Sequence, residues 1–236
     1  MNQFIYKAPY EENGKTVLEV NILPSTYCTF NCIYCPIDRR EERHQTDEIQ
    51  NFGDVSEALK DLLRRMDESG ADEVFLNAHG ESLLHDGLGR IIDAVHEKGA
   101  SVRLLSNGYL LDDPRYRDLA DRCESVIGEL KNATEEGFQK TQRPLPGYTL
   151  DSYISHLKNF RRQYRGHFIF EVSIIKGYTD SEKALSFLES VVCDLHPDEL
   201  SVVPIDAPFR KVLGVEEDKL RRFEARLRKA CGMPEI

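Results

Sequence analysis

Three cysteines lie within eight residues of the chain, at Cys28, Cys32 and Cys35, and they make up half of its six cysteines. Cysteine thiolates bind zinc and iron–sulfur clusters, and the C-x3-C-x2-C spacing brings three of them onto one short loop. Three protein ligands leave a fourth coordination position open, which is typical of catalytic metal centres rather than structural ones. The loop therefore predicts a metal centre that can bind a further ligand.

Two polar turns elsewhere in the chain could contribute to the same site. They read HGES and SNG, and contain Gly80, Glu81, Ser82, Ser106 and Asn107. Each turn follows an apolar segment, as the cysteine loop does. If the three apolar segments are parallel strands, their carboxyl ends meet at one edge of the sheet, where such folds place their chemistry. The alternative for Glu81 and Asn107 is an ordinary structural turn, since Gly, Asn and Ser favour turns.

Hydrophobic patterning supports that arrangement of strands. Strands are predicted at 16–23, 73–78, 101–105, 125–130, 168–175 and 200–204. Amphipathic helices alternate with them, at 54–69, 88–95, 114–122, 157–164, 185–195 and 220–227. This alternation predicts an α/β fold with parallel strands and right-handed crossovers. Six units suggest an incomplete β/α barrel in a single domain over 1–236, with its core at about 16–210 and a C-terminal helix at about 215–231.

Five segments together resemble the radical S-adenosylmethionine (SAM) superfamily. They are NILPSTYCTFNCIYCPIDR, FLNAHGESLLHDGL, VRLLSNGYLL, ATEEGFQKTQRPLPG and EVSIIKGYTDSE. Their order and spacing are similar to those of the archaeal tRNA wyosine synthases and their relatives, over roughly residues 16–210. The resemblance implies a partial (β/α)6 barrel of the radical SAM type. It also implies two cofactors, a [4Fe–4S] cluster and SAM.

The resemblance assigns the cofactor contacts. Cys28, Cys32 and Cys35 would hold three irons of the cluster, and SAM would chelate the fourth. One-electron cleavage of SAM would give a 5′-deoxyadenosyl radical that abstracts hydrogen from a substrate. The further SAM contacts implied are Tyr34 near the adenine, Gly80 and Glu81 at the ammonium, Ser82 in place of the family's proline, Ser106 and Asn107 at the carboxylate or ribose, and Ser173.

The fourth strand departs from the pattern of these relatives. They read Ser-Leu-Asp-Ala where this chain reads Glu129-Leu130-Lys131-Asn132. Glu129 and Lys131 are two residues apart on a predicted strand, so their side chains share a face. We expect Glu129 to contact the SAM ribose or ammonium, and Lys131 to act in the site by binding substrate or the SAM carboxylate. The alternative is that the strand ends early and both side chains are exposed.

The sequence also gives expectations for residues outside these motifs. Lys176, Asp206 and Arg210 follow later strands and are predicted substrate contacts. Cys123, Cys193 and Cys231 are widely dispersed and are predicted to be buried structural thiols. A zinc site with His44 as fourth ligand is the alternative for the cysteine loop. The wyosine synthases carry additional cysteines ahead of the loop, and none precedes Cys28 here, which argues against wyosine synthesis.

Bulk composition limits the partners. The formal charge of −10 disfavours RNA and anionic membranes. No apolar stretch approaches 18 residues, and the N-terminal sequence does not resemble a signal peptide, so we expect a cytoplasmic protein without membrane contact. The expected partners are a small-molecule substrate and a reductant such as flavodoxin or ferredoxin. The alternatives are an RNA-modifying radical SAM enzyme, an activase of a glycyl-radical enzyme, and a zinc-stabilised binding module.

Overall fold

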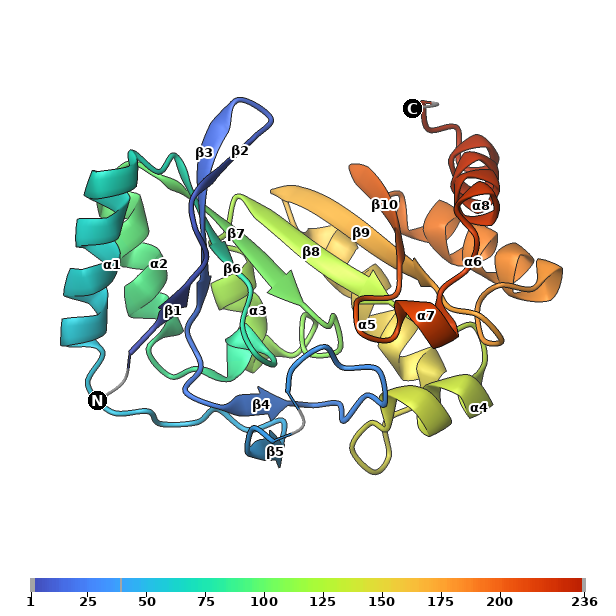
Figure 1. Cartoon of the computed structure of the whole chain (residues 1–236), viewed down its shortest axis with the longest axis horizontal. Helices are drawn as coiled ribbons and strands as arrows, with labels where there is room; N and C mark the ends of the chain where they lie inside the picture. Colours follow the sequence, from blue (N-terminus) through green and yellow to red (C-terminus); the bar gives the residue numbers. More distant parts are fainter. Residues whose placement is uncertain (1–2, 39, 235–236) are drawn as a thin grey trace.

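A curved sheet with parallel central strands organises the molecule (Figure 1). The computed structural model describes residues 3–38 and 40–234, so the ends of the predicted domain lie outside the described residues. The parallel strands are, in spatial order, β3 (Lys15–Asn21), β6 (Glu73–Leu76), β7 (Ser101–Ser106), β8 (Ser125–Leu130), β9 (His167–Ile174) and β10 (Glu199–Pro204). The sheet path ends at β10, so the barrel is partial.

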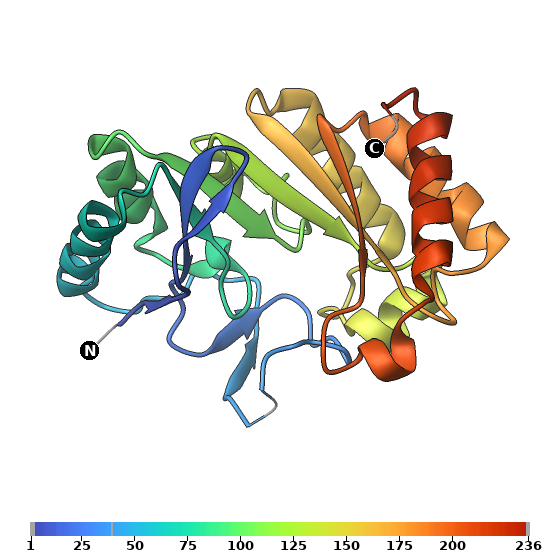
Figure 2. The same cartoon turned by 45° about the horizontal axis from the view of Figure 1, so that its top comes forward.

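Helices cover the outer face of the sheet (Figures 1 and 2), and side chains on its other face line a cavity. The main helices are α1 (Ser56–Ser69), α2 (Leu88–Glu97), α3 (Pro114–Ala120), α5 (Leu150–Gln163), α6 (Glu182–Leu195) and α8 (Glu217–Ala230). Shorter helices follow strands at one edge: η1 (Ser82–Leu84), α4 (Glu135–Gly137), η2 (Phe138–Gln142) and α7 (Arg210–Leu213). The predicted α/β class, its parallel strands and its partial barrel are therefore confirmed.

Strict alternation along the strands separates core from cavity. On β8, Val126 and Leu130 are fully buried in the hydrophobic core, whereas Ile127 and Glu129 line the cavity. Neighbouring strands repeat the pattern because parallel register places equivalent residues side by side, as Glu129 lies opposite Glu171 on β9. The sheet therefore presents one apolar face to the helices and one polar face to the cavity.

The structure also contains strands that the periodicity did not predict. β1 (Ile5–Tyr6) and β2 (Tyr10–Glu12) pair antiparallel with β3. β4 (Thr26–Cys28) and β5 (Arg43–Gln45) form a separate two-stranded sheet around the cysteine loop. These strands have two or three residues each, which is too short to produce a recognisable alternation.

The expectation that all three dispersed cysteines are thiols is wrong. Cys193 on α6 and Cys231 at the end of α8 form a disulfide, although 38 residues separate them in sequence. Cys123 is a buried free thiol, as predicted. The pairing arises because α8 packs against α6, where Arg226 also pairs with Glu189.

Membrane insertion through a helix finds no support in the described ranges. None of the helices there combines the length and apolar character that a bilayer span requires.

Candidate active site

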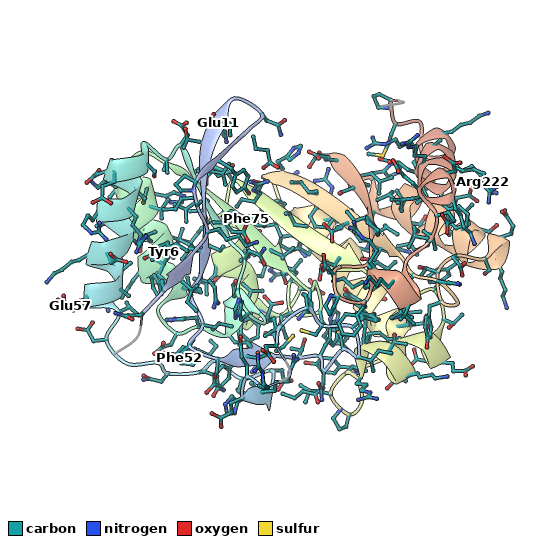
Figure 3. The ribbon with its side chains drawn as sticks, viewed as in Figure 1. Tyr6, Glu11, Phe52, Glu57, Phe75 and Arg222 are labelled. Atoms are coloured by element: carbon teal, nitrogen blue, oxygen red, sulfur yellow. A yellow bond between two sulfur atoms is a disulfide. The ribbon has the colours of Figure 1, made fainter. Side chains whose placement is uncertain are left out.

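A cavity of about 720 Å³ lies on the open face of the sheet. All three cysteines of the loop line it, together with side chains from β7, β8, β9 and β10. Figure 3 shows Phe75 on β6, another lining residue, and the Arg103 guanidinium lies over its ring at 4.4 Å. Three sequence-predicted features, the cysteines, Asn107 and the Glu129–Lys131 pair, thus meet at one site.

Two segments hold the cysteine loop in place. Asn31 and Ile33 donate backbone hydrogen bonds to the carbonyls of Gln142 and Thr141, at 3.0 and 2.8 Å, so the turn of η2 supports one side of the loop. On the other side, the loop continues from β4, which pairs with β5. Burial raises the pKa of the Cys28 thiol to about 12 and that of Cys32 well above its usual value. Metal binding at these thiols must therefore displace protons.

Gly80 lies in the turn after β6 and connects this turn to β4, the strand from which the cysteine loop continues. It forms an isolated parallel bridge with Tyr27, and the next amide, Glu81 N–H, donates to the Tyr27 carbonyl at 2.7 Å. The backbone of Gly80 has a φ of +145°, which residues with a side chain rarely adopt. The same turn therefore requires glycine for both its conformation and its close approach to β4.

The Glu81 side chain is fully buried, and its hydrogen-bond partners belong to its own turn and to the turn after β7. Its carboxylate accepts hydrogen bonds from the Ser106 hydroxyl at 3.0 Å, the Asn107 amide at 2.9 Å and the Leu83 amide at 3.3 Å. Burial raises the pKa of Glu81 to about 7, although these three donors oppose the rise. The HGES and SNG turns are thus connected directly through this carboxylate.

Asn107 continues this connection to the cysteines. Its side-chain amide donates to Thr29 Oγ1 at 3.0 Å and lies 3.5 Å from Cys28 Sγ. Its backbone carbonyl is also within hydrogen-bond reach of the Tyr153 hydroxyl on α5, which reaches the Glu129 carbonyl as well. Tyr153 therefore ties together the carboxyl ends of β7 and β8. Sequence patterning assigned Tyr153 no role, since a tyrosine on the apolar face of a helix has the pattern of an ordinary core residue.

The charged pair at the carboxyl end of β8 has formed as predicted. Lys131 Nζ lies 2.7 Å from Glu129 Oε1, and the two side chains are 19% and 15% exposed, which excludes the alternative of two solvent-exposed side chains. Burial lowers the pKa of Lys131, but the Glu129 carboxylate more than offsets this and the net pKa is raised. Lys131 is therefore held as an ammonium ion, suited to binding an anion rather than to acting as an amine nucleophile.

Glu171 is a cavity residue that sequence reasoning missed. It lies directly opposite Glu129 on the neighbouring parallel strand, so two carboxyl groups lie side by side on the cavity wall. Burial, followed by the Glu129 charge, raises the pKa of Glu171 to about 7, while Lys131 opposes the rise. Glu171 lies on the polar face of the predicted strand 168–175, and this position is the feature of the sequence that could have identified it as a cavity residue.

We expect Glu171→Gln to stabilise the protein much more at pH 8 than at pH 5. A carboxyl whose pKa is raised on folding favours the folded state at low pH, and this contribution is lost as the pH rises from about 4.5 to about 7. Removing the ionisable group should therefore raise the free energy of unfolding by about 3 kcal/mol at pH 8. Guanidinium titrations at both pH values measure this. Glu199→Gln, on the same cavity wall but half exposed, is the control. Equal changes at the two pH values would contradict the expectation.

The remaining predicted residues are distributed around the cavity. Tyr34, Gly80, Asn107 and Asp206 line it. Ser82, Ser106 and Ser173 are buried, and none of the three is among its lining residues. Lys176 and Arg210 are exposed at the edge near α7, where the Lys176 amide donates to the Leu213 carbonyl.

The donor set fits an iron–sulfur cluster better than a single zinc ion. Cys28, Cys32 and Cys35 are unpaired and share one cavity wall. Yet across residues 3–38 and 40–234 no three Cys, His, Asp or Glu side chains converge closely enough to hold one metal ion. A cubane cluster binds each thiolate at a different iron and so accepts this wider spacing. His44, the proposed zinc ligand, instead stacks on Tyr27 with ring centroids 4.3 Å apart.

Comparison with protein families agrees with this site. The family model described as the radical SAM superfamily matches residues 22–188, which include the cysteine loop and both polar turns. A UPF0026 protein of Helicobacter pylori is 25% identical over 211 residues, covering 88% of this chain and 68% of that protein. A UPF0026 protein of Methanocaldococcus jannaschii is 20% identical, covering 87% of this chain and 64% of its own length.

Solved structures share the fold at low sequence identity. A structure of TYW1 with a lysine–pyruvate adduct bound has a TM-score of 0.67 at 15% identity, covering 90% of this chain and 73% of that one. A radical SAM methyltransferase from Sphaerobacter thermophilus has a TM-score of 0.66 at 15% identity, covering 96% and 67%. At these identities the likeness concerns the architecture and leaves the substrate open.

Proposed function

This chain belongs to the radical SAM superfamily, whose enzymes use a [4Fe–4S] cluster and SAM, and we propose that its substrate is a small biosynthetic metabolite. Such a metabolite would be a nucleoside, sugar or amino-acid derivative. The observation that carries this proposal is the cavity. Its volume of about 720 Å³ is in the range of small-molecule sites, and one wall carries the cysteines while the opposite strands carry charged side chains.

Cys28, Cys32 and Cys35 are the proposed ligands of the cluster. They are the only cysteines among the described residues that line the cavity. The bound cofactors supply one-electron cleavage of SAM and hence a 5′-deoxyadenosyl radical that can abstract hydrogen. The chain's own contribution is to fix the loop through η2 and β4 and to surround the reacting groups with protein rather than water.

The residues around Gly80 are proposed to position SAM. Gly80 and Asn107 line the cavity and are the direct candidates for contact, whereas Glu81 fixes both turns through Ser106 and the Asn107 amide. Ser82 and Ser106 would then act by holding the turns in shape. Tyr34, which lines the cavity beside Ile205, is the proposed neighbour of the adenine, and Ser173 the more distant cofactor contact.

Glu129 and Lys131 are proposed to bind polar groups of SAM and substrate. We expect the double variant Glu129→Ala, Lys131→Ala to bind SAM at least about tenfold more weakly, because a charge-assisted hydrogen bond contributes about 1.5–3 kcal/mol. Removing both partners avoids leaving one buried charge alone. Isothermal titration of the reconstituted protein measures this, with the surface pair Lys158→Ala, Asp194→Ala as control. Unchanged SAM affinity in the cavity double variant would refute the assignment.

The proposed function is tested by anaerobic reconstitution with iron and sulfide. The expected results are an electron paramagnetic resonance signal of the reduced cluster that changes on adding SAM, and formation of 5′-deoxyadenosine. Small-metabolite fractions should then increase the yield of 5′-deoxyadenosine, and RNA should not. A protein that binds stoichiometric zinc and no cluster would overturn the cofactor assignment, and stimulation by RNA alone would overturn the substrate class.

A further inference from the structure

We propose that Glu171 recognises a protonated amine of the substrate, so that the metabolite taken by the cavity is an alkylammonium compound. This inference rests on the proposed function and deepens it, because it selects amine-bearing molecules from the wider class of small metabolites. Glu171 lines the cavity from β9, between Glu129 on β8 and Ser201 on β10. The three strands lie side by side in Figure 1.

The cavity wall formed by β8, β9, β10 and the segments directly after them is predominantly acidic. Its charged side chains are four carboxyl groups and one ammonium: Glu129, Glu171, Glu199, Asp206 and Lys131. Lys131 pairs with Glu129. Glu171 forms no ion pair with any cation of residues 3–38 and 40–234. A cationic group on the substrate would supply the partner that the wall itself does not offer.

The depth of Glu171 in the cavity distinguishes it from the residues proposed to contact SAM. Lys131 follows Glu129 by two residues toward the carboxyl edge of the sheet, and its charge acts on the thiol of Cys32. Glu171 lies at the level of Glu129, and is therefore about 6 Å farther than Lys131 from that edge along the strand direction. This greater depth assigns Glu171 to the part of the cavity that receives substrate.

The surroundings of Glu171 suit an organic cation better than a metal ion. Among the described residues, no three Cys, His, Asp or Glu side chains are placed to hold a metal ion, and the carboxylates of this wall are included in that statement. Deeper in the cavity, Ile169 on β9 lies beside Ile127 on β8, and both line it. An alkylammonium ion would place its charge on the Glu171 carboxylate and its carbon atoms against these isoleucines.

Keeping a carboxyl at this position destabilises the free protein. Burial, followed by the Glu129 charge, raises the pKa of Glu171 to about 7. The charged groups that act on it are Glu129 and Lys131 from β8 and its end, and Asp206 after β10. Glutamine has nearly the same shape and would avoid the cost of burying a charge. A carboxyl that lowers stability and lines a cavity is typical of a functional residue.

Binding of the amine would exchange a proton for an ammonium ion. The amine would donate an N–H···O hydrogen bond to the Glu171 carboxylate, and the proton that the free carboxyl held would pass to the buffer. An alkylammonium ion keeps its own proton near neutral pH, as a lysine side chain does. Affinity should therefore rise about tenfold from pH 6 to pH 8, because Glu171 loses its proton across this range.

The test uses three probes of matched size: butylammonium, 1-butanol and butyrate. Each is titrated by calorimetry into the reconstituted protein with its cluster oxidised and SAM at saturation, so that the position of the SAM ammonium is already filled. The variants are Glu171→Gln and, as control, Glu199→Gln, which removes another carboxylate from the same cavity wall.

We expect the wild type to bind butylammonium at least about tenfold more tightly than 1-butanol or butyrate at pH 8, because only the ammonium forms a charge-assisted hydrogen bond with Glu171. Glu171→Gln should lose this preference and the control should keep it. Repeating the butylammonium titration at pH 7 in two buffers of different ionisation enthalpy should reveal proton release in the wild type and none in Glu171→Gln. A purely structural role of Glu171 would not produce this proton release.

The same inference applies to the metabolite fractions expected to increase the yield of 5′-deoxyadenosine. Sulfo-N-hydroxysuccinimide acetate converts primary amines into neutral amides. A fraction treated with this reagent should no longer increase the yield, whereas a fraction treated with the hydrolysed reagent should remain effective.

Four outcomes would overturn the proposal. The wild type could show no preference for butylammonium, Glu171→Gln could keep that preference, or stimulation of 5′-deoxyadenosine formation could survive acetylation. The fourth is a tenfold loss of SAM affinity in Glu171→Gln, which would assign the carboxylate to the cofactor instead. Failure of the proposed function is a separate result, because the wild type would then lack a cluster signal before any probe is added.

Discussion

Replacing Cys32 by alanine should reduce 5′-deoxyadenosine formation to the level of a reaction without enzyme. Cys32 lies in the middle of the cysteine loop and lines the cavity close to Lys131. With only two thiolates remaining on the loop, the cluster would lose one of its three proposed protein ligands. Iron and sulfide content, the electron paramagnetic resonance signal and product formation should all fall together.

Cys123→Ala is the matched control for this loss. Cys123 is also a free, buried cysteine, but it packs in the hydrophobic core and its thiol contacts the Leu119 carbonyl. Its replacement should leave cluster content and product formation unchanged. Thermal melts of the metal-free variants separate loss of a ligand from loss of folding. A Cys32→Ala protein that retains the cluster signal and product would show that this thiolate is not a ligand.

Gly80→Ala should be the most destabilising substitution at the rim of the cavity, lowering the free energy of unfolding by about 4 kcal/mol. A Cβ added at Gly80 would overlap the carbonyl oxygen of Tyr27 and lie 2.8 Å from its carbonyl carbon. The obstruction is backbone, so no rotamer change can relieve it. The positive φ of +145° adds strain for any residue with a side chain. Chemical denaturation of the metal-free protein measures the loss.

Gly53→Ala distinguishes crowding from backbone strain. Gly53 also has a positive φ, of +81°, but an added Cβ there meets nothing within 4 Å. Its replacement should therefore cost about 1 kcal/mol, the strain alone. Similar losses at both glycines would mean that β4 moves away from the turn without cost. In that case the close approach of Tyr27 to Gly80 would not hold the cysteine loop in position.

Much of the fold was predictable because its determinants are local. Along 125–130, alternation of side chains predicted strand β8, and the structure has a strand with the same bounds. The helix over 54–69 and its end at Gly70 followed from apolar spacing and a glycine that adopts the left-handed conformation. The Glu129–Lys131 pair was predictable for the same reason, since residues two apart on a strand share a face.

Contacts between segments distant in sequence were not predictable in this way. The bonds of the Glu81 carboxylate to Ser106 and Asn107 join the turn after β6 to the end of a different strand, β7. Glu171 received no role because its position opposite Glu129 depends on the register of β8 against β9. The Cys193–Cys231 disulfide depends on the packing of α8 against α6.

The sequence by itself determined the chemistry that the chain can hold and the strands that carry it. The C-x3-C-x2-C loop, the polar turns and the β/α alternation are properties of neighbouring residues, and they identified the superfamily and the partial barrel. Only the tertiary structure decided which groups meet: the Glu81 connection between two turns, and the pair of carboxyl groups that β8 and β9 place side by side. The physical reason is that side-chain periodicity is encoded locally, whereas register and helix packing depend on the whole folded chain.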